Sequence, residues 1–448
     1  MGNLPDGQAP VPLLKAGRGE AAAGGAPGDA GEASGDTGGA PGDAGGAPGD
    51  ARPPAVSDAF VARFLVEPSG HGPLSGTRFA AKDLFDVAGH RTGCGNPAWL
   101  ATHSAAKVHA AAIDRLLLAG ALLMGKTRTD ELAYSLDGSN AHEGAPLNPA
   151  APERLTGGSS SGAASAVAAG EIDFALATDT AGSVRVPGSY CGLVGLRPSH
   201  GRVSAAGLMP LAPSFDTVGW LCRTLPVARR VAEVLLDPRT STEVAAVVFD
   251  SEIAGLAEAS TAAAFERLIA ARPGAFHEVA SNFDARAAAQ CLRLLQGYET
   301  WRAHGAWIES AQPHFGAGVA ERFAAARQIG MGEFREAMRE RAAIIASAET
   351  WLPRGLLLCQ PSAPGPAPRR DSSPAALQER RTRAMLMTTF ASLTGRPQIT
   401  LPMLHIDGAP VGVSLIGWKD GDEALFPAAE RLIAAGGAPS SSSVALSS

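Results

Sequence analysis

Apolar and polar positions follow two different rhythms along the chain beyond residue 57. Short apolar runs are typical of strands, whereas apolar residues three and four positions apart are typical of amphipathic helices. The strand-like runs are residues 77–87 with an end near Lys82, 121–127, 173–179, 355–362, 397–402 and 411–417. Because such runs alternate with helical patterns, the sequence predicts a layered α/β domain.

Helical patterns fill several of the intervals between these strands. They are predicted at residues 104–119, 160–170 and 289–348. On the first helix, the inward face is predicted to carry Val108, Ile113, Leu116 and Leu117. Gly120 follows as a stop signal for that helix. The second helix is rich in alanine and is entered through a Gly/Ser loop.

Both ends of the chain lack the apolar positions that a folded core requires. From Gly24 the unit GGAPGDA recurs with small variations. A segment with almost no apolar side chains cannot offset the entropic cost of becoming ordered. We therefore expect residues 1–56 to form a disordered, low-complexity extension and residues 438–448 a flexible tail. The folded domain is then expected at residues 57–437.

Composition and charge narrow the class of protein. Apolar residues make up 45% of the chain and charged residues 18%, which is typical of a soluble globular protein. The formal net charge is −6 and no long basic run is present, so nucleic acid is not an expected partner. The apolar stretch near residues 110–124 is interrupted by Asp114 and Arg115, so no membrane span is expected.

The five cysteines are scattered, with no CxxC pair and no Cys/His cluster. This pattern argues against a disulfide framework and against a zinc site. We expect neither a metal nor a cofactor. No signal peptide is recognisable, so a cytoplasmic location is expected. A homodimer is left open.

The densest chemistry lies between residues 157 and 199. Its Gly/Ser turn is of a kind that binds phosphate, but the motif GxxxxGK[ST] is absent. Residues 158–162 also match the GxSxG nucleophile elbow, which would make Ser160 the nucleophile. That elbow requires a buried strand directly before it, whereas the preceding segment contains Pro152 and two charged residues. Neither alternative accounts for the whole segment.

The segment as a whole resembles the central motif of the amidase signature family. The motif GGSSxG is present at residues 157–162. The motif DTGGSxRxPxxxCG is matched over residues 179–192, with alanine in place of its first glycine. Upstream, AAKDLFDVAG resembles the family's lysine motif and contains Lys82. The resemblance extends over most of residues 72–437, and the middle of the chain is its least diagnostic part.

This resemblance implies a single α/β/α domain around a large mixed β-sheet. It also implies a serine amidase, in which Ser183 is the nucleophile, Ser159 the proton relay and Lys82 the base. An amide is a poor electrophile, so the reaction needs an activated nucleophile and oxyanion donors. A lysine acts as a base only when burial or cationic neighbours lower its pKa. The family also uses a cis peptide bond, which would be Gly158–Ser159.

The resemblance places the oxyanion hole at consecutive backbone N–H groups, namely those of Thr180, Ala181, Gly182 and Ser183. Three further residues are expected to support the site. Asp179 is expected to accept backbone N–H bonds within its turn, and Arg185 to pair with a carboxylate. Ser160 is expected to cap the helix that follows it.

Within the family, the sequence is most similar to indole-3-acetamide hydrolases. This implies hydrolysis of a small primary amide to a carboxylate and ammonia through an acyl-enzyme, with arylacetamides as one candidate class. Glu143 stands where that branch usually has an aromatic residue, which predicts a different pocket polarity. Two alternatives remain: a glutamine-hydrolysing subunit of a tRNA-dependent amidotransferase, and a non-catalytic binding protein on an amidase-like domain. The second is disfavoured because Lys82, Ser159 and Ser183 are all present.

Overall fold

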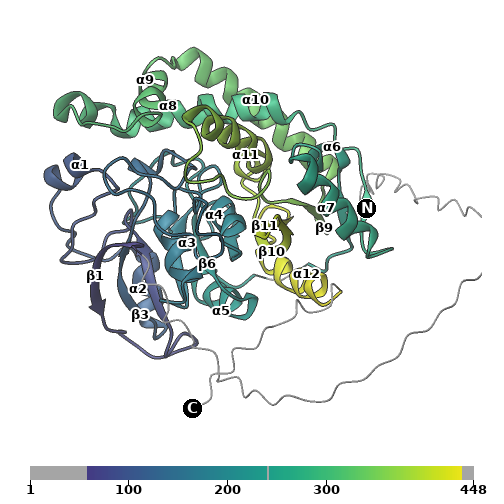
Figure 1. The fold of residues 1–448 in the computed structure, drawn as a ribbon, viewed down its shortest axis with the longest axis horizontal. Coiled ribbons are helices and arrows are strands. Elements are labelled where there is room, and N and C mark those ends of the chain that lie inside the picture. The colour runs from purple at the N-terminus through teal and green to yellow at the C-terminus, as the bar shows by residue number, and fades with distance from the viewer. Residues whose placement is uncertain (1–57, 240–241, 436–448) are drawn as a thin grey trace, which may run out of the picture.

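A mixed β-sheet of eleven strands runs through the molecule (Figure 1). The computed structural model describes residues 58–239 and 242–435. The expected extension at residues 1–56 and the expected tail at residues 438–448 lie outside the described residues. The strand order is β1-β3-β2-β4-β6-β5-β10-β11-β9-β7-β8. Strands β2, β3 and β4 are parallel to one another, and the pairs from β4 through β6, β5, β10 and β11 to β9 are antiparallel.

The strands, in chain order, are β1 (Phe60–Val66), β2 (Arg78–Lys82), β3 (Leu122–Thr127), β4 (Phe174–Thr178), β5 (Val194–Arg197), β6 (Val218–Cys222), β7 (Ala246–Phe249), β8 (His277–Glu278), β9 (Leu356–Pro361), β10 (Gln398–Ile406) and β11 (Ala409–Ile416). The six predicted strands, at residues 77–87, 121–127, 173–179, 355–362, 397–402 and 411–417, are confirmed as β2, β3, β4, β9, β10 and β11. Their side chains are almost all buried in the centre of the sheet. Both faces are therefore covered, which explains why these strands are continuous apolar runs.

The helices are α1 (Pro97–Thr102), α2 (Ala111–Leu118), α3 (Ser161–Ala168), α4 (Arg185–Tyr190), α5 (Leu225–Leu235), α6 (Ser251–Ala254), α7 (Ala259–Ala270), α8 (Ala285–Ala311), α9 (Val319–Arg327), α10 (Met331–Trp351), α11 (Pro374–Thr394) and α12 (Asp422–Ala434), with a short 3₁₀ turn at Glu131–Ala133. Figure 1 shows α8, α9, α10 and α11 grouped on one side of the molecule and α5 and α12 on the opposite side of the sheet. The predicted α/β/α arrangement around one mixed sheet is confirmed.

One helix is shorter than its apolar pattern predicted. Helix α2 begins at Ala111 rather than at residue 104, and the side chain of Val108 is 70% exposed. The preceding backbone is held by loops instead, because the N–H groups of Ala106 and Ala110 donate to His90 O and Asp86 O. These tertiary bonds replace the intrahelical bonds that the sequence predicted.

None of the helices in the described part of the chain combines the length and apolar character that crossing a membrane would require. All five cysteines fall in that part, where they are buried and form no disulfide.

Candidate active site

The site forms where two parallel strands end side by side. Strand β2 ends at Lys82 and its neighbour β4 ends at Thr178, with Ala81 paired to Leu176. The ends of parallel strands meet at one edge of a sheet, so the two side chains are brought together. Lys82 Nζ donates to Thr178 Oγ1 at 2.9 Å and to Ser159 Oγ at 2.7 Å. Its side chain is fully buried.

Two serines continue this chain of contacts. Ser159 lies in the loop before α3, and its Oγ is 3.0 Å from Ser183 Oγ. The Gly158–Ser159 peptide bond is cis, as the family resemblance implied. Ser183 lies between β4 and α4, and it lines a cavity that Ser159 and Lys82 do not reach. The side chains of Lys82, Ser159 and Ser183 therefore form a continuous hydrogen-bonded chain, and its last member, Ser183, lines the cavity.

Asp179 holds the loop that carries Ser183. Its carboxylate accepts N–H bonds from Gly182, Val184 and Arg185, at 2.8, 3.0 and 3.2 Å. The Arg185 side chain donates to both carboxylate oxygens, at 2.9 and 2.7 Å. Burial opposes ionisation, but Arg185 together with Arg197 holds the pKa of Asp179 well below its ordinary range. The loop therefore closes around a fixed negative charge.

The four expected oxyanion donors are not equivalent. The Gly182 N–H donates to Asp179 Oδ1, so it is not available, which corrects the expectation for that residue. The N–H groups of Thr180, Ala181 and Ser183 have no acceptor within the described ranges. Gly182 has φ +133°, a conformation that favours glycine, whereas Ala181 does not have a positive φ. Alanine at position 181 therefore fits the loop without strain.

The electrostatics at Lys82 suit a base. Burial lowers the pKa of Lys82 to about 7, although Asp130, Asp179 and Asp216 oppose this shift. Burial also raises the pKa of Asp130 to about 7, with Asp137 adding to the rise. The two groups interact, and Asp130 lies directly behind the Gly158–Ser159 bond, where it accepts the Gly138 N–H at 3.0 Å. Near neutral pH, Lys82 can therefore be present in its neutral form.

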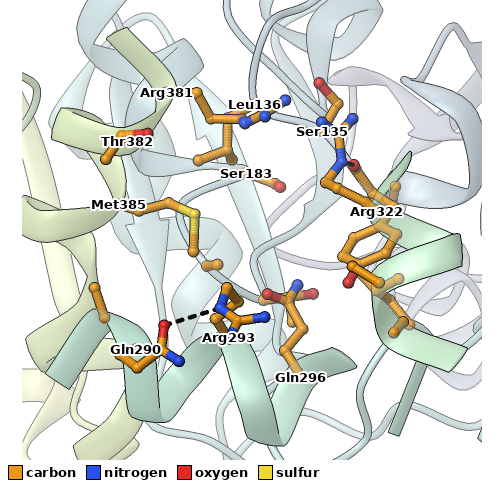
Figure 2. A pocket seen from close by; sticks show the side chains of 18 of the residues that line it. Ser135, Leu136, Ser183, Gln290, Arg293, Gln296, Arg322, Arg381, Thr382 and Met385 are labelled. Atoms are coloured by element: carbon orange, nitrogen blue, oxygen red, sulfur yellow. Dashed lines mark hydrogen bonds between the residues drawn. The ribbon is translucent and has the colours of Figure 1, made fainter. Parts of the chain in front are cut away.

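Ser183 opens onto a cavity of about 370 Å³. Figure 2 shows Ser183 near the centre, with Thr382 and Met385 of α11 on the left and Arg293 and Gln296 of α8 below. Arg322 of α9 closes a further side. A cavity of this size accommodates a small organic molecule.

Two sequence-based expectations are wrong. Ser160 occupies the N-cap position of α3 but makes no capping bond, because its hydroxyl donates to Thr178 O at 3.3 Å. Glu143 does not face the cavity of Ser183. Asn140 Oδ1 accepts the His142 and Glu143 N–H groups, and this turn directs Glu143 into a separate cavity beside Asp83 and Lys126.

The sequence did not single out Thr178, Asp130 or Arg197. Thr178 ends the strand before Asp179, so the strand order would have indicated it once β2 and β4 were known to be neighbours. Arg197 donates to both the carbonyl and the carboxylate of Asp179. Asp130 has no local signal, because its position depends on the fold of the loop at residues 128–138.

Comparison with known proteins agrees with this architecture. The Amidase family model matches residues 66–297. Amidase 1 of Arabidopsis thaliana is 37% identical over 415 residues, which span 84% of this chain and 98% of that protein. Translocon at the outer membrane of chloroplasts 64 of Pisum sativum is 32% identical and is matched over 66% of its length. A solved structure described as an amidase superposes with a TM-score of 0.74 at 31% identity, covering 82% of this chain and 86% of its own.

Fold and sequence together define a hydrolase that acts on amide C–N bonds. The chain belongs to the amidase family, also known as the amidase signature family.

Proposed function

We propose that this protein hydrolyses a small primary amide to a carboxylate and ammonia through an acyl-Ser183 intermediate. One observation carries the proposal: Lys82, Ser159 and Ser183 are linked by contacts of 2.7 and 3.0 Å, and only Ser183 faces a cavity. A non-catalytic amidase-like protein would have no need to keep a buried lysine in contact with one serine that in turn contacts a second.

In the first step, neutral Lys82 Nζ takes the proton of Ser159 Oγ while Ser159 Oγ takes the proton of Ser183 Oγ. Ser183 Oγ attacks the amide carbon, and the carbonyl oxygen becomes an oxyanion. The N–H groups of Thr180, Ala181 and Ser183, which have no acceptor within the described residues, are the proposed donors to that charge. The proton returns along the same path to the amide nitrogen, the C–N bond breaks and ammonia leaves.

The second step repeats these proton transfers with water as the nucleophile. A water molecule gives a proton to Ser159, which passes its own to Lys82, and the oxygen attacks the acyl carbon. Collapse of the new tetrahedral intermediate returns the proton to Ser183 Oγ and releases the carboxylic acid, which loses its remaining proton to solvent to give the carboxylate. Lys82 must be neutral at the start of each step, so kcat/KM should rise with pH through about 7.

The acyl group is the part of the substrate that the cavity selects. Leu136, Leu211, Ile329 and Met385 give it apolar walls, which suit a hydrocarbon chain or ring. Arylacetamides are one such class, and the likeness to Amidase 1 proteins supports a stand-alone amidase. A cytoplasmic location stays a prediction.

The test is an ammonia-release assay on purified protein without tRNA, ATP or added subunits. The panel contains indole-3-acetamide, phenylacetamide, hexanamide, malonamate and glutamine. We expect turnover of at least one small amide, and none by Ser183→Ala. A fluorophosphonate should label Ser183, and label on Ser160 would overturn the mechanism.

If glutamine were the only substrate, and if its hydrolysis required partner subunits, the result would support the amidotransferase alternative. No turnover and no label with any probe would support the binding protein.

A further inference from the structure

The charged residues that line the active-site cavity are all of one sign. Among the described residues, four arginines line it, namely Arg286, Arg293, Arg322 and Arg381, and no aspartate or glutamate does. They come from α8, α9 and α11, so three separate helices direct positive charge toward one space. Figure 2 shows Arg293, Arg322 and Arg381 around the space that Ser183 faces.

These arginines are poorly neutralised by the protein. Arg293 Nε donates to a neutral partner, Gln290 Oε1, at 2.9 Å. Arg381 forms a long ion pair with Asp137, in which Nη1 lies 3.5 Å from Oδ2. Within the described residues, Arg286, Arg293 and Arg322 form no ion pair with a carboxylate. Arg286 and Arg293 are exposed, so solvent can balance their charges, whereas Arg322 is partly buried.

Arg322 is the least satisfied of them. Its Nε donates to Tyr134 O at 2.6 Å, while its Nη1 is buried and has no hydrogen-bond partner. A buried guanidinium N–H without an acceptor is costly, and such groups are rare in folded proteins. Burial, together with repulsion from Arg381, lowers the pKa of Arg322 to about 10, so it stays charged at neutral pH. A carboxylate in the cavity would supply an acceptor for Arg322 Nη1.

We infer that the substrate is an amide whose acyl part carries a carboxylate, bound by Arg322 with Arg293 or Arg381 as its second partner. This inference rests on the proposed function. The charge belongs to the acyl part because the leaving group of a primary amide is ammonia. Guanidinium groups bind carboxylates through paired N–H bonds, which fix both position and orientation. The apolar walls near Leu136 and Met385 contact the carbon skeleton between the two polar ends.

Two matched substrate pairs test the inference. In each pair a methyl group replaces the distal carboxylate: adipic acid monoamide against hexanamide, and 4-(carboxymethyl)phenylacetamide against 4-ethylphenylacetamide. We expect kcat/KM to be at least about tenfold higher for the carboxylate in one pair or both, because a site built for a polar group discriminates against an analogue that lacks it.

The variant Arg322→Gln should remove most of this preference by raising KM for the carboxylate, and should change kcat/KM for the neutral amide less than about threefold. Arg327→Gln is the matched control, because Arg327 lies on the same helix and pairs with the exposed Glu309 at 2.8 Å. Arg327→Gln should leave kcat/KM unchanged for both the carboxylate and the neutral amide.

Equal or better turnover of the neutral members in both pairs overturns the inference and leaves the proposed function in place. So does an equal loss for both members in Arg322→Gln. No ammonia from any of the four amides, or from the panel above, would overturn the proposed function and the inference with it.

Discussion

Two lysines on neighbouring strands of the sheet are buried to the same degree and are placed in opposite surroundings. Lys82 ends β2 and Lys126 lies near the end of β3, where Ala81 is paired with Lys126 and Lys82 with Thr127. Lys126 Nζ is 2.7 Å from Asp83 Oδ1 and also donates to Thr92 Oγ1 and Arg91 O. Among the described residues, the hydrogen-bond partners of Lys82 Nζ are both hydroxyl groups, those of Ser159 and Thr178.

The difference shows that the partners of a buried lysine decide its use more than its burial does. A carboxylate at ion-pair distance stabilises the ammonium form, and that lysine then supports the fold. Hydroxyl partners accept a hydrogen bond from the ammonium, yet they can donate to the neutral amine as well. Lys82 is therefore free to change protonation state, with carboxylates acting on it only from a distance.

Replacing Lys82 by methionine should cause the largest loss of activity of any change near the two lysines. We expect kcat/KM to fall by about 10²–10⁴-fold, the usual contribution of a general base. The fold should persist, because Lys82 makes no ion pair at contact distance and burial already favours the neutral form of Asp130. Steady-state ammonia release and a thermal melt measure the two effects.

Residual activity close to that of the wild type would show that another group serves as base. Combining Lys82→Met with Ser159→Ala should cost far less than the product of the two single losses, because both residues act on one proton path.

Replacing Lys126 by methionine should instead reduce stability. Asp83 would stay buried without its partner, which costs about 3–5 kcal/mol of unfolding free energy. Denaturant titration measures this loss. The double variant Lys126→Met with Asp83→Leu should recover much of it, because no charge is then left buried. If Lys126→Met abolished turnover in a protein of unchanged stability, the contrast between the two lysines would be wrong.

The sequence predicts those features of the two lysines that depend on local motifs. Strands around residues 78–82 and 174–178 were predicted from apolar runs, and the resemblance to the family's lysine motif indicated Lys82, which contacts Ser159. The catalytic role of Lys82 stays a prediction.

What escaped prediction depends on contacts between distant segments. Asp130 lies in a loop, and the sequence of that loop has no periodic apolar pattern from which its shape could be predicted. The cavity arginines come from α8, α9 and α11, up to about two hundred residues from Ser183, in the region where the family motifs are weakest. Ser160 is expected to cap the helix because serine favours that position, but its hydroxyl donates to the carbonyl of Thr178 on a neighbouring segment.

Asp130 offers a way to tune Lys82 without touching it. Its negative charge favours the ammonium form, so removing the charge should lower the pKa of Lys82 further. In Asp130→Asn, the acidic limb of kcat/KM should therefore shift to lower pH by about one unit, since a nearby charge moves a pKa by about that much or more. The amide oxygen can still accept the Gly138 N–H.

The pH profile of kcat/KM measures the shift. Asp173→Asn is the control, because Asp173 accepts the Arg78 N–H at the far end of β2 and should leave the profile unchanged. A shift to higher pH would mean that Asp130 itself, rather than Lys82, controls the limb.

The smallest effect is expected at Ser160, the neighbour of the relay serine. Its hydroxyl is fully buried, donates to Thr178 O at 3.3 Å and does not line the cavity. Removing it in Ser160→Ala leaves one carbonyl short of a weak bond, at a cost of about 1 kcal/mol in stability. Activity should change by less than about threefold, because Lys82 and Ser159 keep their contacts. Thr178→Val is the informative partner variant. It removes a hydroxyl that Lys82 contacts directly, so it should disturb the pH profile, whereas Ser160→Ala should not. A larger loss in Ser160→Ala than in Thr178→Val would place Ser160 on the proton path and would require a different relay.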